Sequence, residues 1–366
     1  MAPSALPTEA QEDVPIRSKS SPVVGLKPTG AADHLAYDDV TPAIGREYAD
    51  VNIVDDILNQ PNADDLLRDL AITISRRGVV FFRKQDNLTN ELQKEFVHRL
   101  GVASGKPSSS SLHIHPVIND SRELGGSDPE ISTISSEQRK KLFKQVLEVD
   151  QKRPYNSAVW HSDIQFENVP ADYTSLRLVQ LPKTGGDTVW ASGYEIYDRL
   201  SKPLQQWLET LTASYVGVGF HRVIQRNPDI KVYEKPRGSP ENVGSDLAAD
   251  HPVIRTNPVS GWKSLYALGE FAQHINGLAK VESDWLLGHF YTLLTQNHDL
   301  QVRFKWKDPN DIAIWDNRSV FHSATFDYDG LGDRFGNRAV GIGERPFLDP
   351  KSKSRQEDLA AQGLIY

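Results

Sequence analysis

Two side chains in the run 158–166 could bind a metal ion together. They are His161 and Asp163, which lie two positions apart among apolar and aromatic residues. Such a run predicts a β-strand, and residues two apart in a strand point to the same face of the sheet. An imidazole and a carboxylate side by side supply two of the three ligands in the 2-His-1-carboxylate set that holds Fe(II). A buried, hydrogen-bonded His–Asp pair leaves the same pattern, so this run alone leaves both interpretations open.

A histidine that could complete the set lies far along the chain. In the run 312–323 an apolar segment leads into Trp-Asp-Asn-Arg, a turn, and then His322. Only a closed fold would bring His322 to Asp163, and a jelly-roll barrel does so because its early and late strands lie side by side. The alternative is a histidine buried in the core without a ligand.

Two arginines and a threonine indicate an anion site near this histidine. Arg334 and Arg338 lie four residues apart, so in a strand they share one face. The guanidinium fork suits a carboxylate or a sulfonate because it donates two parallel hydrogen bonds. A pair of surface salt bridges is the alternative. Thr188 follows the Gly185-Gly186 turn and begins a strand with a hydroxyl free to donate.

Taken together and in this order, these runs resemble the taurine/2,4-dichlorophenoxyacetate dioxygenase family of Fe(II)- and 2-oxoglutarate-dependent oxygenases. The resemblance covers about residues 68–348 and is strongest to the sulfonate branch, including its fungal-type members. It rests on the Gly-Gly-Asp-Thr run, on Trp-Asp-Asn-Arg before the distal histidine, and on the Arg-x-x-x-Arg pair. It implies a mainly β fold with flanking helices, a double-stranded β-helix (jelly roll, cupin-like).

The resemblance also implies a role for each matching residue. His161, Asp163 and His322 would be the catalytic Fe(II) ligands, and dioxygen would react there. Thr188 and Arg334 would bind the distal carboxylate of the cosubstrate 2-oxoglutarate. The substrate residues would be Arg338 and His115, the latter in His-Ile-His-Pro, gripping an anionic group, and Phe220, forming an aromatic wall.

Two positions depart from the taurine pattern. Ile118 replaces a tyrosine, and Ser157 replaces an asparagine; both positions line the family's substrate site. We first expect an alkyl sulfonate such as taurine, hydroxylated next to sulfur with release of sulfite. The alternative is the same oxidation of a carboxylate, an amino acid or a secondary metabolite. A metal-binding protein without catalysis is a further alternative, and an intact Arg334 argues against it.

The composition excludes several other kinds of site. Cysteine is absent from all 366 residues, which excludes disulfides, zinc thiolate sites, iron–sulfur clusters and cysteine nucleophiles. The net charge is −8 with no long basic run, which argues against a nucleic-acid partner. No apolar run approaches the roughly 20 residues of a membrane span, and the N-terminus lacks signal-peptide features. We therefore expect a cytoplasmic protein with a small anionic substrate, and by the resemblance a possible dimer or tetramer.

The remaining sequence is expected to form one catalytic jelly-roll domain over 31–366, with helical insertions, after a disordered or loosely draped arm over 1–30. The predicted helices are 63–77, 92–100, 136–152, 193–212 and 282–295. The predicted strands are 79–82, 158–166, 173–180, 187–191, 213–220, 252–256, 263–267, 312–315 and 338–343.

Overall fold

The structure is a computed structural model that describes residues 23–117, 128–136 and 159–364. Ile118, Ser157, almost all of the helix predicted over 136–152 and the first 22 residues lie outside the described residues. At the described end of the predicted arm, Leu26 donates a backbone hydrogen bond to the Val259 carbonyl at 2.8 Å.

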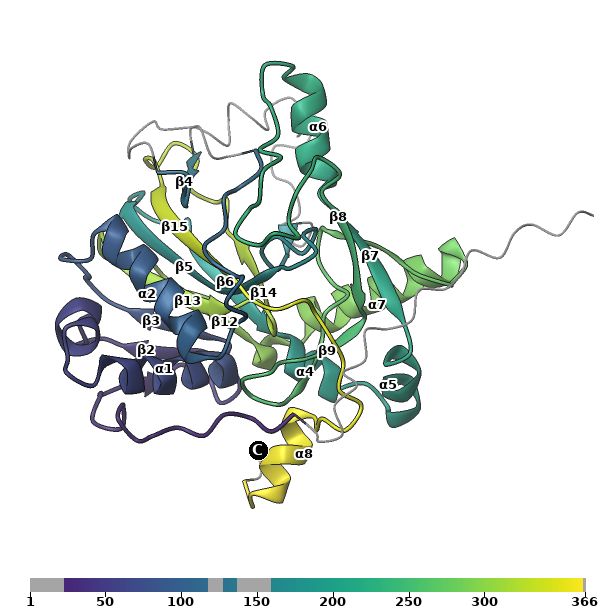
Figure 1. Ribbon diagram of the computed structural model, residues 1–366, viewed down its shortest axis with the longest axis horizontal. Coiled ribbons are helices and arrows are strands. Elements are labelled where there is room, and N and C mark those ends of the chain that lie inside the picture. The colour runs from purple at the N-terminus through teal and green to yellow at the C-terminus, as the bar shows by residue number, and fades with distance from the viewer. Residues whose placement is uncertain (1–22, 118–127, 137–158, 365–366) are drawn as a thin grey trace, which may run out of the picture.

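A seven-stranded sheet brings distant parts of the chain together (Figure 1). All its neighbouring strands are antiparallel except β2 and β3, which are parallel. Strand β13 lies between β3 and β5, so the end of the chain pairs with its first half. The order is β1 (Asp38–Asp39), β2 (Arg46–Tyr48), β3 (Val79–Phe82), β13 (Ile312–Asp316), β5 (Ala171–Gln180), β15 (Phe335–Ile342) and β4 (Ile131–Ser135).

Helices α1 (Ala63–Arg77) and α2 (Asn90–Ala103) cover one face of this sheet (Figure 1). Helix α1 ends at Arg77 as predicted, and Gly78 follows with a φ of 76°, which favours glycine. Helix α2 was predicted to end at Leu100, but it continues to Ala103. Gly101 within it is needed for close packing, because a Cβ there would lie 2.7 Å from an Asp172 oxygen.

A second sheet covers the opposite face. It consists of β12 (Gln301–Phe304), β6 (Thr188–Ser192) and β14 (Val320–Ala324) in that order. The two sheets meet through aromatic side chains: Phe81 stacks on Phe304 at 4.1 Å, and Trp190 lies 5.7 Å from Trp315 between ring centres. Strand β3 is covered on both faces, which explains its continuous apolar sequence.

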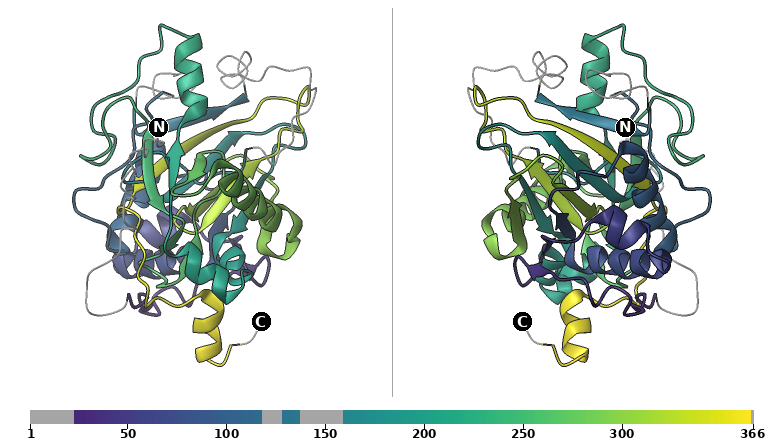
Figure 2. Two further views of the ribbon diagram at one scale, coloured as in Figure 1. Left: turned by 90° about the vertical axis from the view of Figure 1, so that its right-hand side faces the viewer. Right: turned by 90° about the vertical axis from the view of Figure 1, so that its left-hand side faces the viewer.

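The other elements pack beside these two sheets or form the ends of the molecule. Helices α6 and α8 lie at opposite ends in each view (Figures 1 and 2). The remaining strands are β7 (Thr212–Val216), β8 (Ala248–Pro252), β9 (Ile254–Thr256), β10 (Lys263–Leu265) and β11 (Ala272–Ile275). The remaining helices are η1 (Ile53–Leu58), α4 (Gly193–Asp198), α5 (Lys202–Leu208), α6 (Val218–Arg226), α7 (Lys280–Gln296), η3 (His298–Leu300) and α8 (Arg355–Ala361).

The architecture is therefore a mixed α/β one built on several antiparallel sheets. Three local predictions are wrong. The helix predicted over 193–212 is two helices, because the chain breaks after α4 and restarts as α5 with Pro203 in its first turn. The strand predicted over 213–220 ends at Val216, and α6 follows. The described part of 158–166 is no regular strand; only His161 pairs, with His322.

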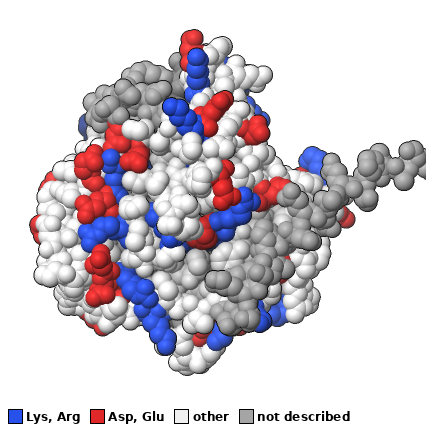
Figure 3. Space-filling view, viewed as in Figure 1, with Lys and Arg blue, Asp and Glu red and all other residues white. Residues whose placement is uncertain are grey.

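Two properties bear on what the protein could bind: the apolar length of its helices and the distribution of surface charge. None of the helices in the described ranges has the length and apolar character to cross a membrane. On the face in Figure 3, acidic and basic side chains are interspersed rather than gathered by sign.

Candidate active site

Three side chains converge where the two sheets meet the irregular segment after Val159. Ligand atoms of His161, Asp163 and His322 lie within 4.8 Å of one another, the one such group of three found among the described residues. His161 and His322 exchange backbone hydrogen bonds of 3.1 and 2.8 Å. The chain then turns, with a positive φ of 51° at Ile164, and this turn directs Asp163 to the two rings. The predicted pairing of side chains is therefore present, although the predicted strand is not.

The protonation of these groups suits a cation. The His161 Nδ1 atom donates to the Val159 carbonyl at 2.8 Å, and its Nε2 atom lies 3.9 Å from Asp163 Oδ1. Burial lowers the pKa of His322 to about 3, so that ring is neutral. Asp163 Oδ2 and His322 Nδ1 are buried without a hydrogen-bond partner among the described residues. Buried polar atoms are nearly always partnered, and a bound metal ion fits this set of acceptors.

Arg338 keeps the carboxylate of this set charged. Its Nη1 atom donates to Asp163 Oδ1 at 2.7 Å, and Asp163 is only 2% exposed. Burial alone would raise the pKa of Asp163, but the charge of Arg338 opposes this, and the pKa is lowered to about 2. The predicted substrate arginine thus contacts a predicted metal ligand directly.

Asn317 holds this carboxylate in place, a role that the sequence did not reveal. Its Oδ1 accepts from the Asp163 backbone N–H and from Trp315 Nε1, both at 3.0 Å. Its Nδ2 donates to Thr174 Oγ1 at 2.8 Å, and its carbonyl accepts from Ser162 Oγ at 2.7 Å. The buried Asn317 therefore joins the irregular segment to β5 and β13. The Trp-Asp-Asn-Arg run was the available signal, but it gave the asparagine no role.

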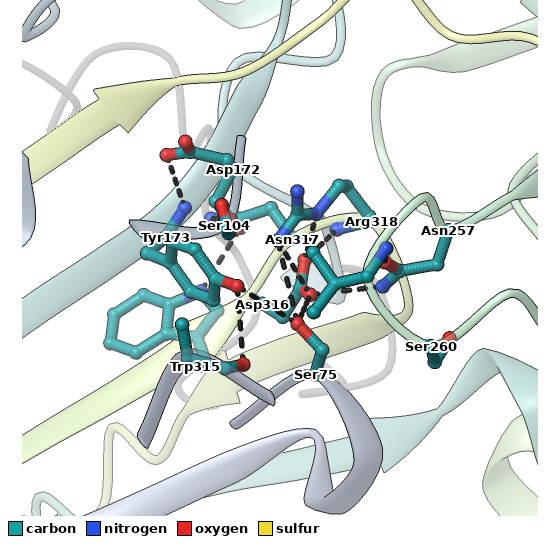
Figure 4. A network of polar contacts seen from close by, with 12 residues as sticks. Ser75, Ser104, Asp172, Tyr173, Asn257, Ser260, Trp315, Asp316, Asn317 and Arg318 are labelled. Atoms are coloured by element: carbon teal, nitrogen blue, oxygen red, sulfur yellow. Dashed lines mark hydrogen bonds and ion pairs between the residues drawn. The ribbon is translucent and has the colours of Figure 1, made fainter. Parts of the chain in front are cut away.

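The turn that carries Asn317 is itself fixed by a buried ion pair (Figure 4). Arg318 donates to both oxygens of Asp316 through Nε at 2.7 Å and Nη2 at 2.9 Å. Asp316 also accepts from Ser75 Oγ at 2.6 Å and from Asn257 Nδ2 at 2.9 Å. A buried ion pair with every acceptor used specifies one geometry, so this network sets the position of β14, which carries His322.

Arg334 is a buried cation with no carboxylate at ion-pair distance among the described residues. It is 3% exposed, and the ion pairs found among the described residues do not include it. Its Nε donates to the Gly186 carbonyl at 2.9 Å and its Nη2 to Thr188 Oγ1 at 3.3 Å. Burial lowers its pKa to about 10. Trp306 Nε1 also donates to Thr188 Oγ1 at 3.2 Å. The Thr188 oxygen therefore accepts in both contacts, and its hydroxyl hydrogen can be donated to a ligand. A carboxylate would satisfy both groups.

The Gly185-Gly186 turn makes room for this cation. Gly186 has a φ of 69°, and a Cβ there would lie 3.1 Å from Arg334 Cδ. The turn predicted from the sequence therefore also shapes the anion site.

His115 and Phe220 lie against each other. The His115 ring is 2% exposed and meets Phe220 edge to face at 4.8 Å. The Val117 backbone N–H donates to His115 Nδ1 at 3.1 Å, which places the ring proton on Nε2. Burial, with the charge of Arg338, lowers the pKa of His115 well below its usual range. His115 is thus a neutral donor beside an aromatic wall.

Two further aromatic side chains, missed from the sequence, join Phe220 to the triad. Phe271 lies 6.2 Å from Phe220 and 5.8 Å from the His161 ring, and Phe166 lies 5.1 Å from Phe271. Their sequence positions carry no chemical signal, and only the fold brings them together. Ile118 and Ser157, the other predicted substrate residues, lie outside the described residues.

A separate surface hollow of about 880 Å³ lies elsewhere, between α4, α8 and the loop Val40–Ala43. Its arginines are already paired, since Arg355 and Arg199 both donate to Glu195. None of the triad lines it, so it is not the site described above.

Comparison with known proteins gives consistent matches. The family model described as "Taurine catabolism dioxygenase TauD, TfdA family" matches residues 36–340. The chain is 52% identical over 343 residues to "Alpha-ketoglutarate-dependent dioxygenase btcD" of Neocamarosporium betae, covering 91% of this chain and 97% of that protein. It is 33% identical to "Alpha-ketoglutarate-dependent sulfonate dioxygenase" of Saccharomyces cerevisiae, covering 87% and 69%. The crystal structure of a taurine dioxygenase from Burkholderia xenovorans aligns with a TM-score of 0.63 at 26% identity, covering 87% and 92%.

Proposed function

Because the chain belongs to the TauD/TfdA family of alpha-ketoglutarate-dependent dioxygenases, we propose that His161, Asp163 and His322 hold its Fe(II) and that Arg334 and Thr188 hold its 2-oxoglutarate. The enzyme is an oxidoreductase acting on a small molecule, and its cofactors are Fe(II) and 2-oxoglutarate. The observation that carries the assignment is the buried, unpartnered oxygen of Asp163 grouped with the imidazole nitrogens of His161 and His322.

Each neighbouring side chain has a distinct part in this proposal. Bound Fe(II), with 2-oxoglutarate and dioxygen, supplies the oxidising chemistry. Arg334 neutralises the distal carboxylate of 2-oxoglutarate, and the Thr188 hydroxyl orients that carboxylate by donating a hydrogen bond to it. Arg338 keeps Asp163 ionised and in place through the 2.7 Å contact. The rings of Phe220 and Phe271 exclude water from the side where the substrate enters.

The substrate that we favour is a carboxylate, an amino acid or a secondary metabolite with an apolar part. Its anionic or accepting group would receive hydrogen bonds from Arg338 and His115, and its apolar part would lie against Phe220. The similarity to known proteins favours this class over a simple sulfonate. The relative at 52% identity has a name without a sulfonate, whereas two relatives named for sulfonates are 33% identical. The aromatic wall beside His115 fits the apolar part of such a substrate.

An alkyl sulfonate is the second candidate. The pairing of an arginine with a neutral histidine donor suits any small oxyanion, and relatives named for sulfonate and sulfate ester substrates do match the chain. Hydroxylation next to sulfur would then release sulfite.

We also propose that the two facing sheets form the double-stranded β-helix of this family and that residues 31–366 form one catalytic domain. The pairing of β13 between β3 and β5 supports this, because it closes the chain on itself. By family resemblance, the enzyme would assemble as a dimer or a tetramer.

A substrate panel tests the proposed function. The enzyme is incubated with Fe(II), 2-oxoglutarate, dioxygen and one compound each time, drawn from aryl and alkyl carboxylates, amino acids and alkyl sulfonates including taurine. We expect succinate to rise most with a carboxylate or an amino acid. Strongest turnover with a sulfonate, and equimolar sulfite, would select the second candidate instead. Absence of 2-oxoglutarate consumption under all conditions would contradict both.

A further inference from the structure

Three buried polar residues take no part in the mechanism above. His113, Glu167 and Arg237 are 1%, 2% and 1% exposed. They come from three different segments: the loop 111–117, the segment that follows Asp163, and the insertion 217–247 between β7 and β8. Fully buried charges are rare and costly unless they are paired, so their position calls for a reason.

The three side chains form one connected cluster. Arg237 donates to both oxygens of Glu167, from Nε at 2.5 Å and from Nη2 at 2.8 Å. Glu167 Oε1 also accepts from His113 Nε2 at 3.3 Å. Although burial tends to raise the pKa of Glu167, the neighbouring Arg237 and His113 lower it, so the carboxylate is ionised. The cluster is therefore a charge-assisted link between three segments.

Arg237 also fixes the insertion to which it belongs. Its Nη1 atom donates to the carbonyls of Tyr233 and Gly244, at 2.8 and 2.9 Å. The Tyr233 N–H in turn donates to the Pro116 carbonyl at 2.9 Å. Because one guanidinium makes four hydrogen bonds, loss of Arg237 would release the insertion from Glu167 and weaken its hold on the loop 111–117.

The insertion also packs closely against the loop 111–117. Gly238 has a φ of 79°, and a Cβ there would lie 2.5 Å from the Leu112 carbonyl oxygen. Its own carbonyl accepts from the Ser111 N–H at 2.8 Å. The two segments therefore pack backbone to backbone, and their relative position is set closely.

The substrate residues project from the segments that this cluster joins. Phe220 belongs to the insertion, His115 belongs to the loop, and their rings meet at 4.8 Å. The His113 ring lies 6.1 Å from the His115 ring. None of the contacts described for the cluster reaches His161, Asp163 or His322.

We propose that the His113–Glu167–Arg237 cluster positions the substrate-binding residues: it docks the insertion 217–247 and the loop 111–117 onto the segment after Asp163, and so sets where Phe220 and His115 meet the substrate. The inference rests on the proposed function for the identity of the substrate side, while the docking itself does not depend on it. The three residues are positioning residues, since the contacts that carry the proposal are with each other and with the backbone.

The test compares Arg237→Met with a matched control, Arg345→Met. Arg345 forms an exposed ion pair with Glu241 of the same insertion, and the two side chains are 54% and 48% exposed. Trypsin can cleave the insertion at the exposed residues Arg222, Arg226 and Lys231. We expect Arg237→Met to speed cleavage at these bonds about tenfold, because cleavage follows the population of the undocked insertion. Arg345→Met should cleave like the wild type.

A kinetic split separates positioning from general destabilisation. With the panel compound that gives the wild type most succinate, Arg237→Met should raise the substrate KM about tenfold and leave the 2-oxoglutarate KM within twofold. Glu167→Gln, which keeps the shape of the side chain, should show a smaller effect in the same direction, and it decides the matter if Arg237→Met does not fold. Cleavage by trypsin needs no substrate, so it also tests the proposal if no compound of the panel is turned over.

Equal cleavage of Arg237→Met, Glu167→Gln and the wild type would overturn the proposal. So would a parallel rise of the KM values for substrate and 2-oxoglutarate, because that would mean a general loss of structure. Failure of the proposed function would appear differently, as absence of 2-oxoglutarate consumption by the wild type, with the cleavage result unaffected.

Discussion

The metal end and the substrate end of the site are built in different ways. At the metal end, His322 lies on β14 and Asp163 is held by Asn317, whose amide is hydrogen-bonded to β5 and β13. At the substrate end, His115 and Phe220 come from a loop and from an insertion. The first set is fixed by sheets that also form the core, whereas the second can vary without disturbing them. The difference suggests how one oxidative chemistry is combined with a particular substrate.

The largest effect is expected from removing a metal ligand. His322→Ala should weaken Fe(II) binding by more than about 100-fold, because even partners outside the ligand set are worth about 10–100-fold. Binding of Mn(II), followed by the loss of its free-ion electron paramagnetic resonance signal, measures this without turnover. The control is His289→Ala, on the surface helix α7. Equal Mn(II) affinity of the two variants would show that the metal end lies elsewhere.

A somewhat smaller effect is expected at Arg334. Arg334→Ala should raise the KM for 2-oxoglutarate about 10- to 150-fold, because a charge-assisted hydrogen bond contributes about 1.5–3 kcal/mol. Metal affinity should stay within twofold. The matched control is Arg303→Ala, whose side chain is 54% exposed and paired with Asp187. An unchanged KM for 2-oxoglutarate in Arg334→Ala would show that Arg334 does not bind the cosubstrate.

Asn317→Ala tests whether the metal end depends on its supporting network. We expect about a tenfold loss of Mn(II) affinity and a lower midpoint of thermal unfolding, since buried donors of Trp315 and Asp163 lose their acceptor. Asn317→Asp keeps that acceptor oxygen and should unfold at a higher temperature than Asn317→Ala. Wild-type metal affinity in Asn317→Ala would mean that the ligands hold their positions without it.

The smallest effect is expected at the substrate end. Phe220→Ala should raise the KM of the best panel compound about three- to tenfold, the value of one or two aromatic contacts. Fe(II) and 2-oxoglutarate binding should not change, because Phe220 lies on the insertion and not on the sheets. Should cosubstrate binding fall as well, the two ends would not be separable in the way described.

The sequence predicted the chemistry of the site better than its local structure. His161, Asp163 and His322 were identified by residue type and order, and the fold brings them within 4.8 Å. The strand expected around Asp163 is not formed, because the backbone turns at Ile164 instead. A turn can bring two side chains together as well as a strand can. The prediction that His161 and Asp163 lie close together was therefore right, although the strand from which it was argued is not formed.

Other parts of the site could not be predicted because their signals exist only in three dimensions. Phe271 has an ordinary apolar sequence position, and it matters only because it packs beside His161. Glu167 and Arg237 lie 70 residues apart, and nothing in either neighbourhood indicates their pairing. Contacts of this kind depend on tertiary packing rather than on periodicity or motif.

The most direct test of the central claim is an anaerobic absorption titration. Adding Fe(II) and then 2-oxoglutarate to the wild type should produce the visible metal-to-ligand charge-transfer band of a chelated 2-oxo acid. Asp163→Ala should show no band at any concentration, and Arg334→Ala should show it only at much higher 2-oxoglutarate. Absence of the band in the wild type, or an undiminished band in Asp163→Ala, would contradict the account.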